Sequence, residues 1–202
     1  MVDGIFFINH ALNVKALSVY NEQQRFEQTL ETISSIDKMC PNNRKYIFDS
    51  SPIEPNNDYF KELNNRNVEI VYTGQVEDVK KFSSIGMRSL SETISFIIFL
   101  DWFKSQNVVG KRIYKLSGRY RLNDNFVLND DSFSNAFVFA KALSSWMPED
   151  KKSETGIDKL FRLRLWHMDY NLLDMFRSFL PKIFEDCLRY NIDIEHAYYK
   201  HL

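Results

Sequence analysis

Polar side chains follow each of the four short apolar runs that are typical of strands in this sequence. They are Asn9-His10, Asp49-Ser50-Ser51, Thr73-Gly74 and Ser117-Gly118-Arg119. If the strands are parallel, their carboxyl ends meet at one edge of the sheet, which is where ligands bind in open α/β sheets. We therefore expect the functional surface at this edge, centred on the turn Ser117-Gly118-Arg119. Asp49-Ser50-Ser51-Pro52 also fits an ordinary Asx-type turn that closes a strand.

Basic residues gather around that turn. They are Lys115, Arg119 and Arg121. Gly118 permits a close approach of the backbone to a ligand, and it equally permits a left-handed turn that binds no ligand. The same residues also fit a solvated basic turn with weak surface ion pairs, so both interpretations stay open.

The bulk properties exclude several classes of protein. The chain has 202 residues, of which 44% are hydrophobic, and its formal net charge is −1. This predicts one domain, residues 1–202, without the basic field of a general nucleic-acid binder. Cys40 and Cys187 fit neither a disulfide framework nor a zinc site. With no signal-peptide pattern and no apolar run long enough to span a bilayer, the chain is expected to be cytoplasmic.

The elements that must position the polar residues alternate between strands and helices. Apolar runs predict strands, and apolar side chains three and four residues apart predict helices. The result is an α/β fold, a mostly parallel central sheet flanked by helices, with strands at 5–8, 45–48, 68–72 and 112–116 and helices at 22–39, 58–66 and 89–106. Ser89 and Glu92 are interpreted as a capping box at the start of the helix at 89–106. The N-terminus of a helix is also a ready site for anions.

The pattern weakens in the last third of the chain. We expect a strand at 136–140, a polar loop at 144–156, an edge strand at 160–166 where apolar and basic residues alternate, and a final helix at 194–202. Residues 171–190 have helical spacing, and Pro181 is expected to break or restart that helix. No Walker, dinucleotide-binding, nucleophile-elbow or zinc-protease motif occurs anywhere in the sequence.

Residues 4–126 resemble the nucleotide-diphospho-sugar transferases of the GT-A type, glycosyltransferases with one Rossmann-like domain. The likeness rests on the strand at 5–8, the helix at 25–37 with its Thr29-Leu30-Glu31-Thr32-Ile33 run, the strand ending Phe48-Asp49-Ser50-Ser51, the buried helix after Arg88-Ser89 and the strand at 113–116. The resemblance implies that His10, Asp49 and Ser50 lie near the nucleoside. It also places Arg88 and Ser89 near the nucleotide, and residues 127–202 on the acceptor side.

The sequence departs from that family at its most diagnostic motif. GT-A enzymes carry Asp-x-Asp after the fourth strand, whose carboxylates hold a divalent cation against the diphosphate, and this chain has Ser117-Gly118-Arg119 there. Fixed guanidinium groups can neutralise a departing diphosphate as a metal does. The hypothesis is a metal-independent transferase in which Lys115, Ser117, Arg119 and Arg121 bind the donor. Asp124 keeps Mn²⁺ or Mg²⁺ open as the alternative.

Several residues near the C terminus are candidates for the group that accepts the proton of the acceptor hydroxyl in an inverting transfer. Asp193-Ile194-Glu195-His196 is similar to a Glu-His element on the acceptor side of some polysaccharide-synthesis transferases. Glu195, Asp169, His196 and His167 all have side chains that can take a proton from an acceptor hydroxyl. Glu195, Asp169 and His196 are the predicted catalytic residues, without a ranking among them.

Two functions are carried forward. The first is a glycosyltransferase that moves a sugar from a nucleoside-diphosphate sugar to a glycan or lipid-linked acceptor. The second is a non-catalytic domain of the same fold that binds a nucleotide-sugar or another protein, which the missing Asp-x-Asp motif favours. Neither predicts nucleic acid as a partner or a transmembrane segment.

Overall fold

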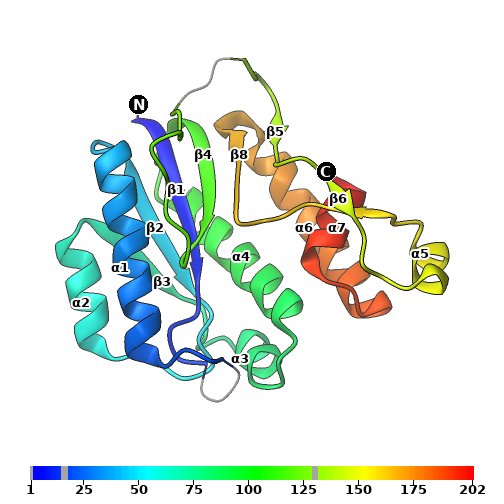
Figure 1. The fold of residues 1–202 in the computed structure, drawn as a ribbon. Coiled ribbons are helices and arrows are strands. Elements are labelled where there is room, and N and C mark those ends of the chain that lie inside the picture. The colour runs from blue at the N-terminus through cyan, green and yellow to red at the C-terminus, as the bar shows by residue number, and fades with distance from the viewer. Residues whose placement is uncertain (1, 15–17, 129–131) are drawn as a thin grey trace.

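The computed structural model describes residues 2–14, 18–128 and 132–202, with a six-stranded sheet at the centre (Figure 1). Its strands are Val2–His10 (β1), Arg44–Asp49 (β2), Val68–Tyr72 (β3), Gly110–Ser117 (β4), Phe137–Val138 (β5) and Leu165–Asp169 (β8). They lie in the order β3-β2-β1-β4-β8-β5, parallel from β3 to β4, with β8 antiparallel to both of its neighbours. The predicted α/β class with a mostly parallel sheet is confirmed.

Helices cover both faces of this sheet (Figure 1). They are Glu22–Met39 (α1), Asn57–Asn65 (α2), Glu77–Ser84 (α3), Arg88–Ser105 (α4), Glu149–Thr155 (α5), Leu173–Tyr190 (α6) and Ile194–His201 (α7). Helix α1 begins as predicted, because the side chain of Asn21 accepts a hydrogen bond from the backbone N–H of Gln24. None of these helices in the described part of the chain is long and apolar enough to cross a membrane.

Strand β1 is buried on both faces, which fixes its central place. Ile5 and Phe7 pack with α4, α6 and α7, whereas Phe6 and Ile8 pack with α1. Successive side chains of a strand point to opposite faces, so an uninterrupted apolar run suits a strand that is covered on both sides. All four side chains are fully buried, and each such burial contributes roughly 1.5–3 kcal/mol.

Helix α4 supplies much of the core behind the sheet. Phe7 lies edge-on to Phe99 and Phe103, each with ring centroids 4.8 Å apart, and Phe48 stacks on Phe96 at 4.8 Å.

The predicted capping box at the start of α4 is wrong. The N-cap is Met87 without a side-chain hydrogen bond, because Ser89 accepts from the backbone N–H of Ile194 and Glu92 pairs with Lys115.

Three expectations for the last third of the chain are also wrong. Residues 160–166 do not form an edge strand: a two-residue strand, Lys159–Leu160 (β7), pairs with Leu143–Ser144 (β6), the chain turns, and β8 then enters the sheet between β4 and β5. The turn is fixed by Lys115, whose Nζ donates to the carbonyl of Leu163. Helix α6 continues through Pro181, which is exposed, so water can satisfy the carbonyl one turn earlier. The expected loop at 144–156 contains α5.

The carboxyl ends of four strands meet at one edge, as predicted. Asn9 pairs with Ser117, His10 with Asp49, and Asp49 with Tyr72. Along the chain, β1 is followed by β2 on one side of it, whereas β3 is followed, through α4, by β4 on the other side. The order of connection therefore reverses between β1 and β4, and ligands of open α/β sheets bind at such switch points.

Candidate functional site

A solvent-open pocket lies at this switch point, between the ends of β1 and β4 and the first turn of α4. Its cavity volume is about 130 Å³. Its polar lining comes from both strand ends, from α1 and from α4. The lining residues are Asn9, His10, Ala11, Val14, Arg25, Phe48, Ser50, Ser83, Arg88, Ser91, Glu92, Ser117, Gly118 and Arg119. Five of the nine predicted substrate-binding residues are in this set: His10, Ser50, Arg88, Ser117 and Arg119.

A buried hydrogen-bond network forms the wall behind the pocket. His10 Nδ1 lies 2.9 Å from Asp49 Oδ2, and His10 Nε2 lies 2.6 Å from Thr29 Oγ1. Asp49 also accepts hydrogen bonds from the backbone N–H groups of Leu12 and Ser51. Burial alone would raise the pKa of the Asp49 carboxyl, but the hydrogen bonds and charge of His10, together with Ser51, outweigh it and lower that pKa. Asp49 is fully buried and therefore acts by holding His10 in place.

Gly118 is present because its neighbours leave no room for a side chain. A Cβ atom at this position would lie 2.9 Å from His10 Cδ2 and 3.2 Å from the carbonyl oxygen of Asn9. Its N–H donates to that same carbonyl, and its φ is not in the left-handed region. The left-handed turn considered from the sequence is therefore not found, and the group that packs against Gly118 is His10.

Three arginines converge on the pocket, and one of them, Arg25, was not predicted from the sequence. Burial and then the charges of Arg119 and Arg88 lower the pKa of Arg25 to about 10. Its guanidinium donates to the carbonyl of Ala11 and to Ser18 Oγ, which fix it against the pocket wall. The spacing of the sequence does indicate that Arg25 is buried. Arg25 and Thr29 are four residues apart, on the face of α1 that also carries the buried Phe26.

One carboxylate, Glu92, also lines the pocket, one helical turn after Arg88 on α4. Its Oε1 lies 3.0 Å from Nζ of Lys115, a residue that is only 2% exposed. The same Nζ donates to the carbonyl of Leu163 at 3.1 Å. Lys115 was predicted to bind the donor, but the structure places it under the pocket as the partner of Glu92.

Serine hydroxyls make up much of the remaining polar lining. Ser50 Oγ donates to the carbonyl of His10, Ser83 Oγ donates to the carbonyl of Ser50, and Ser83 and Ser91 share a short hydrogen bond. Ser91 belongs to α4, where Arg88, Ser91 and Glu92 fall on one face because residues three and four apart are neighbours on a helix. The pocket therefore offers positive charge, hydroxyls and one carboxylate.

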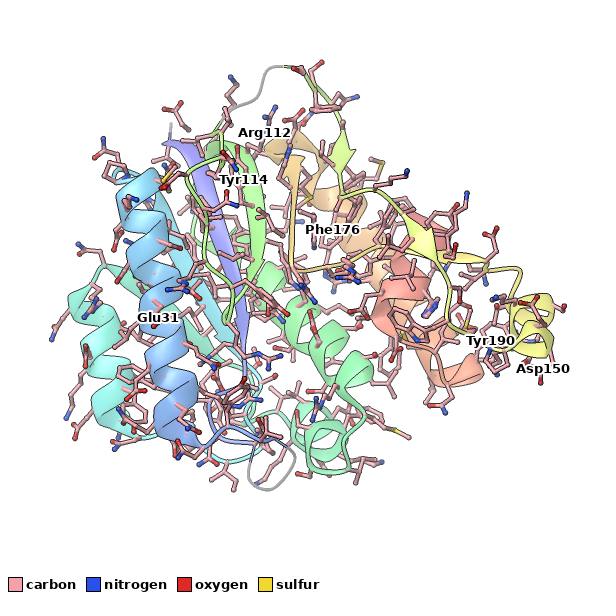
Figure 2. All side chains as sticks on the ribbon, in the orientation of Figure 1. Glu31, Arg112, Tyr114, Asp150, Phe176 and Tyr190 are labelled. Carbon is pink, nitrogen blue, oxygen red and sulfur yellow. The ribbon has the colours of Figure 1, made fainter. Side chains whose placement is uncertain are left out.

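Three predicted ligand residues lie outside the pocket. Ser89 is on the far side of Arg88, in a groove shared with Leu188 and Asp193. Arg121 is exposed and 3.7 Å from Glu31, a residue on the outer face of α1 that Figure 2 labels. Asp124, the alternative metal ligand, is exposed, and its pKa is lowered by a 2.8 Å ion pair with Lys38.

The three catalytic candidates are not brought together. Asp169 pairs with Arg112 at 3.0 Å, at the opposite end of β4, where Figure 2 shows Arg112 near the upper edge of the sheet. His196 is fully buried, its Nε2 lies 2.9 Å from Ser145 Oγ, and burial lowers its pKa. The third candidate, Glu195, has a pKa that is affected by the charges of Glu92 and Lys115. Burial raises the pKa of Glu195, the negative charge of Glu92 raises it further, and the positive charge of Lys115 lowers it.

The residues present do not fit the divalent cation that the GT-A resemblance implies. A divalent cation in this family needs hard oxygen ligands from carboxylates. The turn after β4 supplies Ser117, Gly118 and Arg119, and the Asp124 carboxylate is held at the surface by Lys38. Within residues 2–14, 18–128 and 132–202, no group of three or more His, Cys, Asp or Glu side chains has the arrangement of a metal site.

No known protein family matches the chain, and no curated protein matches its sequence. Among solved structures, the fold is similar to that of a 4-diphosphocytidyl-2C-methyl-D-erythritol synthase from Anaerococcus prevotii DSM 20548. The sequence identity is 12% and the TM-score is 0.48, over 90% of this chain and 74% of that chain. At this level of similarity, function has to be argued from the residues of the pocket.

Proposed function

We propose that the pocket binds a nucleoside diphosphate that carries a sugar, with the diphosphate oxygens on Arg25, Arg88 and Arg119. The convergence of these three guanidinium groups at the topological switch point is the observation that carries the proposal. The three guanidinium groups repel one another, and an anion bound between them is attracted to all three. Guanidinium groups also match phosphate oxygens in geometry, because they donate paired hydrogen bonds.

The charges that remain near the pocket support an anion of this size. Asp49 is paired with His10 and Glu92 with Lys115, and among the described residues neither carboxylate forms an ion pair with Arg25 or Arg119. A diphosphate supplies the negative charge that these two guanidinium groups attract. The serine hydroxyls and the edge of β1 then supply hydrogen-bonding groups for the uncharged parts of the ligand.

Glycosyl transfer is the reaction that we propose for such a ligand. The bond between the sugar's anomeric carbon and the diphosphate oxygen breaks, and a bond to an acceptor hydroxyl of a glycan or lipid-linked molecule forms. The guanidinium groups stabilise the departing nucleoside diphosphate. Glu195 takes the proton of the acceptor hydroxyl, since a raised pKa suits a carboxylate for that role.

Binding of nucleotides to arginine variants tests the proposal. Wild-type protein is titrated calorimetrically with UDP-, GDP-, CMP- and dTDP-sugars, with and without EDTA, and the best ligand is then used on Arg25→Ala, Arg119→Ala and Arg121→Ala. A hydrogen bond to a charged group is worth about 1.5–3 kcal/mol, so the first two variants should weaken binding by about 10- to 100-fold.

Arg121→Ala is the matched control, because Arg121 is an exposed arginine two residues from Arg119 and outside the pocket. It should leave affinity unchanged. The absence of binding by every nucleotide, or equal losses in the Arg119 and Arg121 variants, would show that the pocket is not a diphosphate site.

A non-catalytic nucleotide-sugar-binding domain is the second candidate. The positions of the candidate bases favour it, because none of Asp169, Glu195 and His196 is among the residues that line the pocket. Release of free nucleoside diphosphate from the bound nucleotide-sugar separates the two. Transfer or slow hydrolysis supports the enzyme, whereas tight binding without any release over hours supports the binding domain.

A further inference from the structure

The pocket has hydrogen-bond acceptors that a diphosphate cannot use. Glu92 engages Lys115 through Oε1, and no described residue donates a hydrogen bond to its Oε2. Asn9 Oδ1 is a buried atom without a hydrogen-bond partner among the described residues, and Asn9 also lines the pocket. Buried acceptors are satisfied in most proteins, so Asn9 Oδ1 indicates a ligand that carries donors, and Glu92 Oε2 is a partly exposed acceptor that such a ligand can use.

The negative charge of Glu92 decides which part of the ligand carries these hydrogen-bond donors. A carboxylate repels phosphate oxygens, so the diphosphate belongs with Arg25, Arg88 and Arg119 rather than beside Glu92. The part of the ligand that meets Glu92 must therefore be uncharged and rich in hydroxyl groups. A carboxylate accepts hydrogen bonds from neutral hydroxyls strongly, because such bonds are charge-assisted.

The support beneath Glu92 has the features of a specificity site. Lys115 is buried and held by the carbonyl of Leu163, so it fixes the position of the carboxylate to which it is paired. The side chain of Glu92 is itself 25% exposed, so it can reach a ligand. Ser91 precedes it in α4, and Ser91 and Ser117 line the same pocket.

We propose that Glu92 binds hydroxyl groups of the sugar and makes the pocket discriminate between a nucleoside-diphosphate sugar and the free nucleoside diphosphate. This inference rests on the proposed function, since it takes the diphosphate position from it. Lys115 is a positioning residue that acts through Glu92. The order of the ligand in the pocket is then diphosphate between the three arginines and sugar beside Glu92, one turn further along α4 than Arg88.

The inference predicts effects of opposite sign on two related ligands. Glu92→Gln removes a negative charge, so free UDP, GDP or dTDP should bind as tightly as before or more tightly. The matching sugar nucleotides, such as UDP-glucose, UDP-N-acetylglucosamine, GDP-mannose and dTDP-glucose, should bind about 10-fold more weakly because charge-assisted hydrogen bonds are lost. A mere loss of structure would weaken both ligands together.

Titration calorimetry on each nucleotide pair measures this. Glu31→Gln, an exposed glutamate on α1, is the control and should leave both affinities unchanged. Because the glutamine variant leaves a buried lysine without its charged partner, Glu92→Asp is measured as well: it keeps the charge, shortens the side chain and should weaken only the sugar nucleotide.

The outcomes separate this inference from the proposed function. If wild-type protein binds the nucleotides but both Glu92 variants change the paired ligands equally or not at all, the inference is overturned and the diphosphate site stands. If wild-type protein binds no nucleotide of any pair, the proposed function fails and the inference fails with it. Selective loss of the sugar nucleotide supports both.

Discussion

Replacing Gly118 by alanine places a methyl group where His10 and the end of β1 already lie. The new Cβ would be 2.9 Å from His10 Cδ2 and 3.2 Å from the carbonyl oxygen of Asn9. His10 cannot turn away, because Asp49 and Thr29 hold both of its ring nitrogens. Overpacking of this kind costs about 1–3 kcal/mol, and the lower entropy of an unfolded alanine returns about 0.4–1 kcal/mol. The net expectation is a loss of about 1–2 kcal/mol in the free energy of unfolding.

Urea unfolding of a double-mutant cycle measures this effect. Gly118→Ala should cost less in a His10→Ala background than in the wild type, because the imidazole that the methyl group meets is gone. The strained turn also carries Arg119, so nucleotide affinity should fall in the single variant. A Gly118→Ala protein as stable as the wild type, or an equal cost in both backgrounds, would refute the packing of His10 against this turn.

Two further predictions concern the titration of buried carboxylates. The pKa of Asp49 is lowered on folding, so its stabilisation is present above its ordinary value of 3.8 and is lost as the pH falls through the folded value. Asp49→Asn should therefore be several kcal/mol less stable than the wild type at pH 7, about 3 by comparison with other broken buried pairs, and the difference in chemical unfolding should shrink below about pH 4. The pKa of Glu195 is raised above its ordinary value of 4.5, so its ionisation opposes folding as the pH rises above that value. Glu195→Gln should be more stable than the wild type at pH 7 and equally stable at pH 4, and an unchanged stability difference between the two pH values would contradict this.

Features with strong local signals could be predicted from the sequence. The apolar spacing from Phe26 to Ile36 and the cap at Asn21 predict α1, and the uninterrupted run from Ile5 to Ile8 predicts a strand buried on both faces. The meeting of the strand ends could be predicted as well, because neighbouring parallel strands have their carboxyl ends at the same edge of the sheet. The positions of His10, Ser50 and Arg119 at the pocket depend on this geometry alone.

What could not be predicted depends on partners distant in the chain. Ser89 and Glu92 have the spacing of a capping box, yet Ile194 and Lys115, from α7 and β4, bind these side chains instead. The alternation at 160–166 is that of a strand, but tertiary hydrogen bonds turn the chain there. No sequence pattern in a single chain distinguishes such contacts from local ones.

The candidate site shows the same division. Arg119 follows a strand and is visible as a candidate, whereas Arg25 is one charge among many in an amphipathic helix until its burial is known. Asp169 and His196 have suitable side chains, but the first belongs to the end of β8 that pairs with the start of β4, and the second faces the interior. Chemical type alone does not place a residue at a site.

A crystal structure of the protein with its best-binding nucleoside diphosphate, grown in EDTA, tests the central claim most directly. The account predicts density for the two phosphates in contact with the guanidinium groups of Arg25, Arg88 and Arg119, at the ends of β1 and β4. Density for the diphosphate elsewhere on the protein, or binding that appears only when Mn²⁺ joins the phosphates to Asp124, would contradict it.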